Sequence, residues 1–105
     1  MTVVFLREWD NASEEDRQQK YREFTKEVRE KREYYEKKFE GLIKSSSDWS
    51  DITRHMISLI EFENAEAFSK WWADEEIQML HIKLCHLVDN FTYRLLRPGI
   101  YIKPK

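Results

Sequence analysis

The chain has 105 residues, of which 41% are hydrophobic, and we expect a single domain over residues 1–105 with one modest core. Its 18 Lys and Arg residues against 20 Asp and Glu residues leave a net charge of −2, which argues against a strongly basic nucleic-acid-binding protein. Only 2 Gly and 2 Pro occur, where average usage gives about 7 and 5, so a sandwich or propeller of many short strands is disfavoured.

The N-terminal part is predicted to form a strand and then a long helix. Thr2–Trp9 is rich in β-branched and aromatic residues, as is typical of a strand. Ser13 is predicted to cap the helix, with Asp16 three residues later as a weak capping-box partner. Glu14–Glu40 contains no Gly or Pro and has apolar residues at helical spacing, which predicts one helix of about 27 residues, roughly 40 Å long. Gly41 then follows as a capping glycine with a positive φ.

Three further strands are predicted. Leu42–Ser47 is a weak, serine-rich candidate, followed by a turn at Asp48–Asp51. Thr53–Glu63 has good β character, and Asn90–Arg97 alternates as a fourth strand. Ile100–Lys103 is predicted to add a short extension at the edge of the sheet.

A second helix is expected between the third and fourth strands. Asn64 is predicted to cap it, and we expect it to end near Leu87 with a break around Asp74. The resulting order, β-α-β-β-α-β, predicts an α+β, ferredoxin-like fold: a four-stranded antiparallel sheet with two helices on one face.

Both faces of the predicted sheet are apolar. One face carries Val3, Phe5, Trp9, Met56, Ile60 and Phe62, and the other carries Val4, Leu6, Ile57 and Leu59. Two helices cover only one face, and an exposed face of this kind would exceed the few hundred Å² typical of monomers. We therefore expect a homodimer that packs sheet to sheet.

Several classes of protein and site are disfavoured. The single cysteine, Cys85, permits no internal disulfide and no site that needs two thiolates. Met1–Trp9 is too short for a signal peptide, and no apolar run is long enough to span a membrane. Nucleotide-binding and zinc motifs do not occur. We expect a cytoplasmic protein with no metal, no nucleic-acid partner and no membrane partner.

The segment IEFENAEAFSKW (Ile60–Trp71), followed by Met79-Leu80-His81, resembles the antibiotic-biosynthesis-monooxygenase-like branch of the dimeric α/β-barrel proteins. That branch typically runs from an apolar strand into a helix with an Ala-Phe-x-x-Trp core and a later histidine. The resemblance implies a cleft between sheet and helices that takes a flat, apolar, often aromatic substrate.

Haem-degrading members of that branch use a helix histidine as iron ligand, a role that the resemblance places on His81. They also use an asparagine on the first strand and a tryptophan on the third, where this chain has Arg7 and Phe62. Oxygenases and cyclases of the branch do without that triad. No cofactor is therefore expected, and haem on His81 is the alternative.

His81 is the main catalytic candidate because an imidazole with a near-neutral pKa can act as a general base. The alternative is a partly buried structural histidine bonded to a backbone carbonyl. His81 and Cys85 are also four residues apart on a helix, a spacing at which two side chains can share a metal.

Arg7 is the second catalytic candidate. It shares a strand face with apolar residues, where a charge is costly unless it is paired or faces an anion. Arg7 is predicted to hold a phenolate, enolate or carboxylate oxygen, or else to form an internal salt bridge. The residues expected to contact substrate are Phe62, Trp9, Phe5, Ser58, Trp72 and Tyr93.

The main functional hypothesis is a small dimeric enzyme, a cofactor-independent oxygenase acting on an apolar aromatic or polyketide-like molecule. The alternatives are a polyketide cyclase of the same fold, a dimer that binds a ligand or haem without turnover, and a structural dimer with a filled core. If the protein is an oxygenase, a cyclase or a ligand-binding dimer, we expect Arg7, Phe62 and His81 to converge on one cavity.

Overall fold

The computed structural model describes residues 1–53 and 55–99. These residues form β1 (Val3–Asn11), α1 (Glu15–Glu30), α2 (Arg32–Lys38), β2 (Ile43–Ser50), β3 (His55–Phe62), α3 (Ala65–Trp72), α4 (Glu75–Leu87) and β4 (Val88–Leu96). The predicted β-α-β-β-α-β order is confirmed, with each expected helix divided in two. The predicted extension at Ile100–Lys103 lies outside the described residues.

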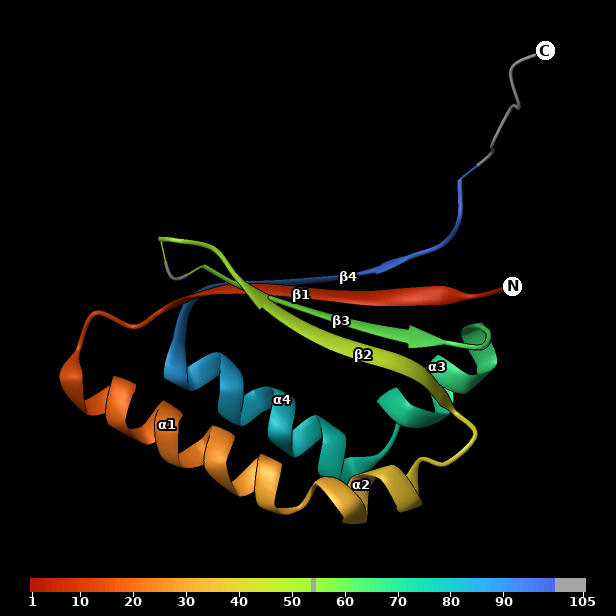
Figure 1. The fold of residues 1–105 in the computed structure, drawn as a ribbon, viewed down its shortest axis with the longest axis horizontal. Coiled ribbons are helices and arrows are strands. Elements are labelled where there is room, and N and C mark those ends of the chain that lie inside the picture. The colour runs from red at the N-terminus through yellow and green to blue at the C-terminus, as the bar shows by residue number, and fades with distance from the viewer. Residues whose placement is uncertain (54, 100–105) are drawn as a thin grey trace.

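The four strands form one antiparallel sheet in the order β2-β3-β1-β4. Figure 1 shows that α1 to α4 all lie on one side of this sheet, while the opposite side carries no helix. The arrangement confirms the predicted ferredoxin-like fold. It also leaves the outer face of the sheet, which the sequence predicts to be apolar, uncovered by the residues that the structure describes.

The helix-facing side of the sheet forms the core, in two clusters. The first core cluster consists of Val3, Phe5, Phe39, Ile60, Phe62, Ala67, Phe68, Trp71 and Ile77. The second core cluster consists of Trp9, Phe24, Leu84, Leu87 and Val88. The strand residues that the period of two predicts to face the helices are found in or against these clusters, so this part of the prediction is confirmed.

The prediction of one long helix over Glu14–Glu40 is wrong, because the helix is interrupted at Lys31. The Lys31 backbone has φ −96° and ψ 13°, and its N–H is shared between the carbonyls of Glu27 and Val28, each at 3.2 Å. The break lets α1 bury Phe24 in the second core cluster while the end of α2 directs Phe39 into the first. A straight helix of roughly 40 Å would not place both side chains against a twisted sheet.

The helix caps are predicted with mixed success. Asn64 Oδ1 accepts a hydrogen bond from Ala67 N at 2.8 Å, and Asp74 caps α4 by accepting from Ile77 N at 3.1 Å, so the cap and the break are confirmed. The predicted cap at Ser13 is wrong, because α1 begins after Glu14 and no side chain caps it.

The hairpin between β2 and β3 is displaced from its predicted position. Strand β2 runs through Ser50, so the predicted turn at Asp48–Asp51 is wrong for all but its last residue. Asp51 Oδ1 accepts hydrogen bonds from the backbone N–H groups of Thr53 at 2.8 Å and His55 at 3.0 Å, which fixes the turn there. Gly41, before β2, has a φ of +82°, as predicted.

None of the helices in the described ranges is long and apolar enough to cross a membrane.

Candidate functional site

A row of polar side chains crosses the sheet on its helix-facing side. Asp48 on β2 pairs with Ser58 on β3, Ser58 pairs with Arg7 on β1, and Arg7 pairs with Tyr93 on β4. Directly paired residues of an antiparallel sheet point to the same face, so all four side chains point toward the helices. Because Ser58 is 2% exposed, this is the helix-covered face.

Arg7 is the only cation of this row, and it has no counterion among residues 1–53 and 55–99. Its Nη2 donates a hydrogen bond to Ser58 Oγ at 3.1 Å, and its Nε is buried with no hydrogen-bond partner. Among residues 1–53 and 55–99, Arg7 makes no ion pair, so the alternative of an internal salt bridge is wrong. Burial lowers the pKa of the guanidinium, and the charge of Asp48 opposes that shift from two strands away. A buried cation with a free donor is suited to an incoming anion.

His81 approaches the same region from α4. Its ring meets those of Trp72, Phe91 and Tyr93 edge-on, with centroid distances of 4.9, 5.2 and 5.0 Å. Burial, and then the positive charge of Arg7, lower the pKa of His81, so the imidazole is neutral at pH 7. Its Nδ1 is buried and has no hydrogen-bond partner among the described residues, which is unusual for a polar atom.

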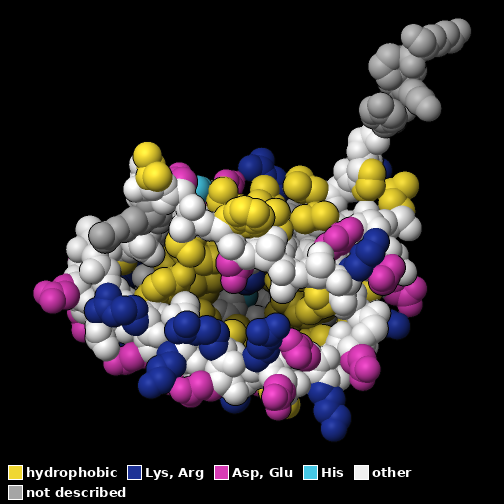
Figure 2. Space-filling model, viewed as in Figure 1, with side chains coloured by type: hydrophobic (Ala, Val, Ile, Leu, Met, Phe, Trp, Pro, Cys, Tyr) yellow, Lys and Arg dark blue, Asp and Glu magenta, His cyan; other side chains and the backbone are white. Residues whose placement is uncertain are grey.

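The helices leave this face of the sheet partly open. Helix α1 packs against α4 and β4, and the β2 residues after Ile43 are exposed. Figure 2 shows the resulting hollow between the β2 edge and α1–α2, with hydrophobic side chains around it and charged and histidine atoms visible within it. We call this hollow the cleft. Arg7 lies two strands inward from Asp48, on the helix-facing side of the sheet.

The predicted substrate-binding residues fall into two groups. Phe62 is 0% exposed and Phe5 is 1% exposed, and Trp9 is also buried, so these three are core residues rather than walls of a cleft. Trp72 is partly accessible, Tyr93 is exposed, and both rings contact His81.

Phe62 also lies too far from Arg7 to share a cavity with it. Phe62 pairs with Val3 and Ser58 pairs with Arg7, a separation of four positions along β3, or roughly 13 Å. The predicted convergence of Arg7, Phe62 and His81 is therefore wrong for Phe62. Arg7 and His81 lie close enough for the charge of Arg7 to lower the pKa of His81.

Three residues at this site were missed by the sequence analysis. Asp48 was predicted to lie in a turn, and only the register of β2 places it beside Ser58. Tyr21 on α1 is influenced by the charges of Asp48 and Arg7. Phe91 lies on the helix-facing side of β4 with Tyr93. The spacing of two residues in the predicted fourth strand already places both side chains on one face.

The described surroundings of His81 do not resemble a metal site. Within the described ranges, no group of three or more His, Cys, Asp or Glu side chains is arranged to hold a metal ion. His81 Nε2 already contacts Cys85 Sγ at 3.8 Å, Nδ1 is buried, and aromatic rings surround the imidazole.

Comparison with solved structures shows that the fold is shared with oxygenase-like proteins. Similar structures include a mutant form of SnoaB, a cofactor-independent oxygenase from Streptomyces nogalater, with 11% identity, 98% of each chain covered and a TM-score of 0.68. A proposed antibiotic biosynthesis monooxygenase from Deinococcus radiodurans has 13% identity, 100% of this chain and 99% of that chain covered, and a TM-score of 0.66.

A dimeric ferredoxin-like protein of unknown function from Jannaschia species has 12% identity, 93% of this chain and 100% of that chain covered, and a TM-score of 0.64. No protein-family sequence profile matches the chain, and no curated protein sequence matches it. At these identities the likeness establishes the fold, which the chain shares with proteins of the antibiotic-biosynthesis-monooxygenase type.

Proposed function

We propose that the protein is a cofactor-independent oxygenase that acts on a flat, apolar aromatic or polyketide-like substrate with an acidic C–H or O–H group. The observation that carries this proposal joins Arg7, a half-buried cation with no ion pair among the described residues, to His81, a neutral imidazole. Tyr93 pairs with Arg7 across the sheet, and its ring lies 5.0 Å from the ring of His81. His81 accepts a proton from the substrate, and Arg7 stabilises the substrate anion that remains. The fold shared with SnoaB adds support.

The first step is removal of a proton from the substrate. His81 accepts the proton, and the remaining electron pair delocalises onto the substrate oxygen, whose charge Arg7 neutralises. Trp72, Phe91 and Tyr93 hold the flat ring system beside the imidazole. Without a ligand, the positive charge of Arg7 disfavours protonation of His81. The negative charge of the substrate anion offsets this repulsion.

The second step uses the electrons of the substrate itself. For a methylene beside a carbonyl, the anion gives one electron to O₂, and the substrate radical and superoxide combine to form the C–O bond of a peroxide. His81 returns its proton to the peroxide. The O–O bond then breaks as the carbon loses its second hydrogen, which leaves a new carbonyl and one molecule of water.

The functional unit is proposed to be a homodimer in which two sheets pack through their outer faces. Trp49 pairs with Ile57, and Leu96 pairs with Val4, so both residues enlarge the predicted apolar face. Trp49 is 62% exposed and Leu96 is 41% exposed. Figure 2 shows hydrophobic side chains on the side of the sheet away from the helices. Exposed apolar side chains gathered on one sheet face favour an interface.

The test is O₂ uptake with anthrone, a tricyclic ketone with an acidic methylene, in buffer containing a metal chelator. We expect the protein to consume O₂ and form anthraquinone in equal molar amounts above the spontaneous rate. His81→Gln is expected to lower the rate by about a hundredfold or more, the usual contribution of a general base. His86→Gln, on an exposed part of the same helix, is the matched control and should retain the rate. Equal rates in wild type and His81→Gln would contradict the proposal.

A further inference from the structure

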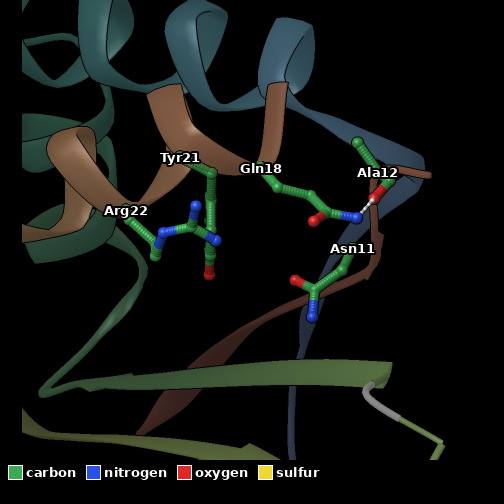
Figure 3. Close-up of a pocket in the computed structure, with 5 residues that line it drawn as sticks. All are labelled: Asn11, Ala12, Gln18, Tyr21 and Arg22. Atoms are coloured by element: carbon green, nitrogen blue, oxygen red, sulfur yellow. Dashed lines mark hydrogen bonds between the residues drawn. The ribbon is translucent and has the colours of Figure 1, made fainter. Parts of the chain in front are cut away.

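A small pocket lies at the start of α1, where β1 ends. It has a volume of about 260 Å³ and is lined by Asn11, Ala12, Gln18, Tyr21 and Arg22. Figure 3 shows Gln18 and Tyr21 extending from α1 toward the strands, with Asn11 on the other side of the opening. None of the proposed catalytic residues belongs to this pocket.

The polar side chains of the pocket are equipped to donate hydrogen bonds. Gln18 Nε2 donates to the Ala12 carbonyl at 2.7 Å, which ties the end of β1 to α1 and fixes the shape of the pocket. Arg22 Nη2 donates to Gln19 Oε1 at 2.7 Å, and the other N–H groups of the planar fork remain to bind a ligand. Asn11 adds an amide, and no acidic side chain lines the part of the pocket that the structure describes.

Tyr21 connects the pocket to the cleft. Its ring packs against the second core cluster, which contains Trp9. Burial raises the pKa of the Tyr21 phenol, so its hydroxyl stays protonated and is a donor. Trp9 lies two residues after Arg7 on the same face of β1, so Tyr21 packs beside the polar row on the sheet and also lines the pocket. Tyr21 is therefore the side chain that the pocket shares with the helix-facing side of the sheet.

We infer that this pocket binds a carboxylate carried by the substrate, with Arg22 as the cation and Asn11 and Tyr21 as neutral donors. The inference rests on the proposed function and narrows its substrate class to an aromatic molecule with an acidic side arm. Arg7 then serves the anion formed in the reaction, and Arg22 serves the permanent charge. Two separate cations allow both charges to be bound at once.

Two fluorescent probes test this assignment: 3-(9-anthryl)propanoic acid and 3-(9-anthryl)propan-1-ol. They differ in the carboxylate alone, and binding is measured by energy transfer from tryptophan to anthracene. We expect the acid to bind about tenfold more tightly than the alcohol, the effect of one charge-assisted hydrogen bond in a partly open site. Arg22→Gln should remove this preference and leave the affinity for the alcohol unchanged. Arg29→Gln, an exposed arginine on the same helix, should keep it.

The possible failures are distinguishable. If the alcohol binds but the acid binds no more tightly, or if Arg7→Met removes the preference and Arg22→Gln does not, the pocket does not bind the carboxylate. If the acid alone binds, and does so through Arg22, the pocket assignment holds and the apolar cleft of the proposed function does not. If neither probe binds, both proposals are contradicted.

Discussion

Arg7 and His81 influence each other before any ligand enters. A protonated His81 would place a second positive charge near a buried guanidinium, so the resting state is a cation beside a neutral base. That state is useful for catalysis at pH 7, because the base is ready and the anion-binding group is charged. It also makes the titration of His81 a direct measure of the site. His55, whose pKa is shifted in the opposite direction, serves as the comparison.

The titration midpoints of His81 and His55 are predicted to fall on opposite sides of 6.5. Burial and Arg7 lower the pKa of His81. A hydrogen bond with Asp10, at 2.7 Å, and a contact with Glu8 raise the pKa of His55. NMR chemical shifts followed from pH 4 to 9 should place His81 below 6.5 and His55 above it. Arg7→Met should move the His81 midpoint upward and leave His55 in place; an unmoved His81 would show that Arg7 does not act on it.

The stability of the Arg7→Met variant separates a functional from a structural role. Arg7 is half-buried and has no ion pair within the described ranges, so its replacement by methionine is expected to stabilise the protein by about 1 kcal/mol and to abolish the anthrone reaction. Ser58 loses its hydrogen-bond partner in this variant, so Arg7→Met with Ser58→Ala is the appropriate second variant. Urea denaturation measures the free energy of unfolding of the single and the double variant. A loss of stability in the double variant would mean that Arg7 is there to support the fold.

At the scale of elements, the helix caps determine where the chain turns toward the site. Asn64, two residues after the end of β3, caps α3, which carries Trp72, and Asp74 caps α4, which carries His81. Lys38 at the end of α2 contacts both Asp74 and Glu76, at 3.1 and 2.8 Å, and holds α2 against the start of α4. These contacts position α4, and therefore the imidazole, relative to the sheet.

Asn64→Ala is expected to lower the free energy of unfolding by about 1 kcal/mol, the usual value of a side-chain cap, and Asn64→Asp to retain it. Ser13→Ala provides the control, because Ser13 is adjacent to a helix start but caps nothing. It should change stability by less than about 0.5 kcal/mol. Chemical denaturation of the three variants checks this, and equal losses for Asn64→Ala and Ser13→Ala would contradict the assignment of caps.

The elements with strong patterns could be predicted from the sequence, and the others could not. The period of two in β1 and β3 identified the inward residues, and Asn64 and Asp74 indicated the divided second helix. Strand β2 is an exposed edge with four serines, so no apolar period marks its end. The break at Lys31 comes from packing α1 and α2 against the sheet. Because this cause is tertiary, no Gly or Pro marks the break in the sequence.

The same division applies to the site. Arg7 and His81 were identifiable because each is polar in an apolar setting. The depth of Phe62 and the position of Asp48 depend on register, since a shift of one residue along a strand reverses the face on which a side chain lies.

At the scale of the whole molecule, the uncovered outer face is the main unpartnered surface. Leu59 lies near its centre, between Leu6 on β1 and Ser47 on β2. Leu59→Glu is predicted to give a folded monomer, because an unpaired charge in a buried interface costs several kcal/mol. In a monomer the same glutamate reaches water, so circular dichroism should stay native-like.

Sedimentation velocity at micromolar concentration measures this outcome. The wild type should sediment as a dimer and Leu59→Glu as a monomer. Ile82→Glu introduces the same charge at a 50% exposed position on α4 and should remain dimeric. A monomeric wild type, or a dimeric Leu59→Glu, would contradict packing through the sheets.

The most direct test of the proposed chemistry is the acidity of anthrone bound to the protein without oxygen. Under anaerobic conditions the anion cannot react onward, and its absorbance reports the fraction deprotonated as pH is varied. Binding beside Arg7 and His81 is predicted to lower the apparent pKa of anthrone by roughly one unit or more, which corresponds to about 1.4 kcal/mol of preference for the anion. Arg7→Met should abolish the shift. An unchanged or raised pKa for anthrone bound to the wild type would contradict a site built to form and hold a substrate anion.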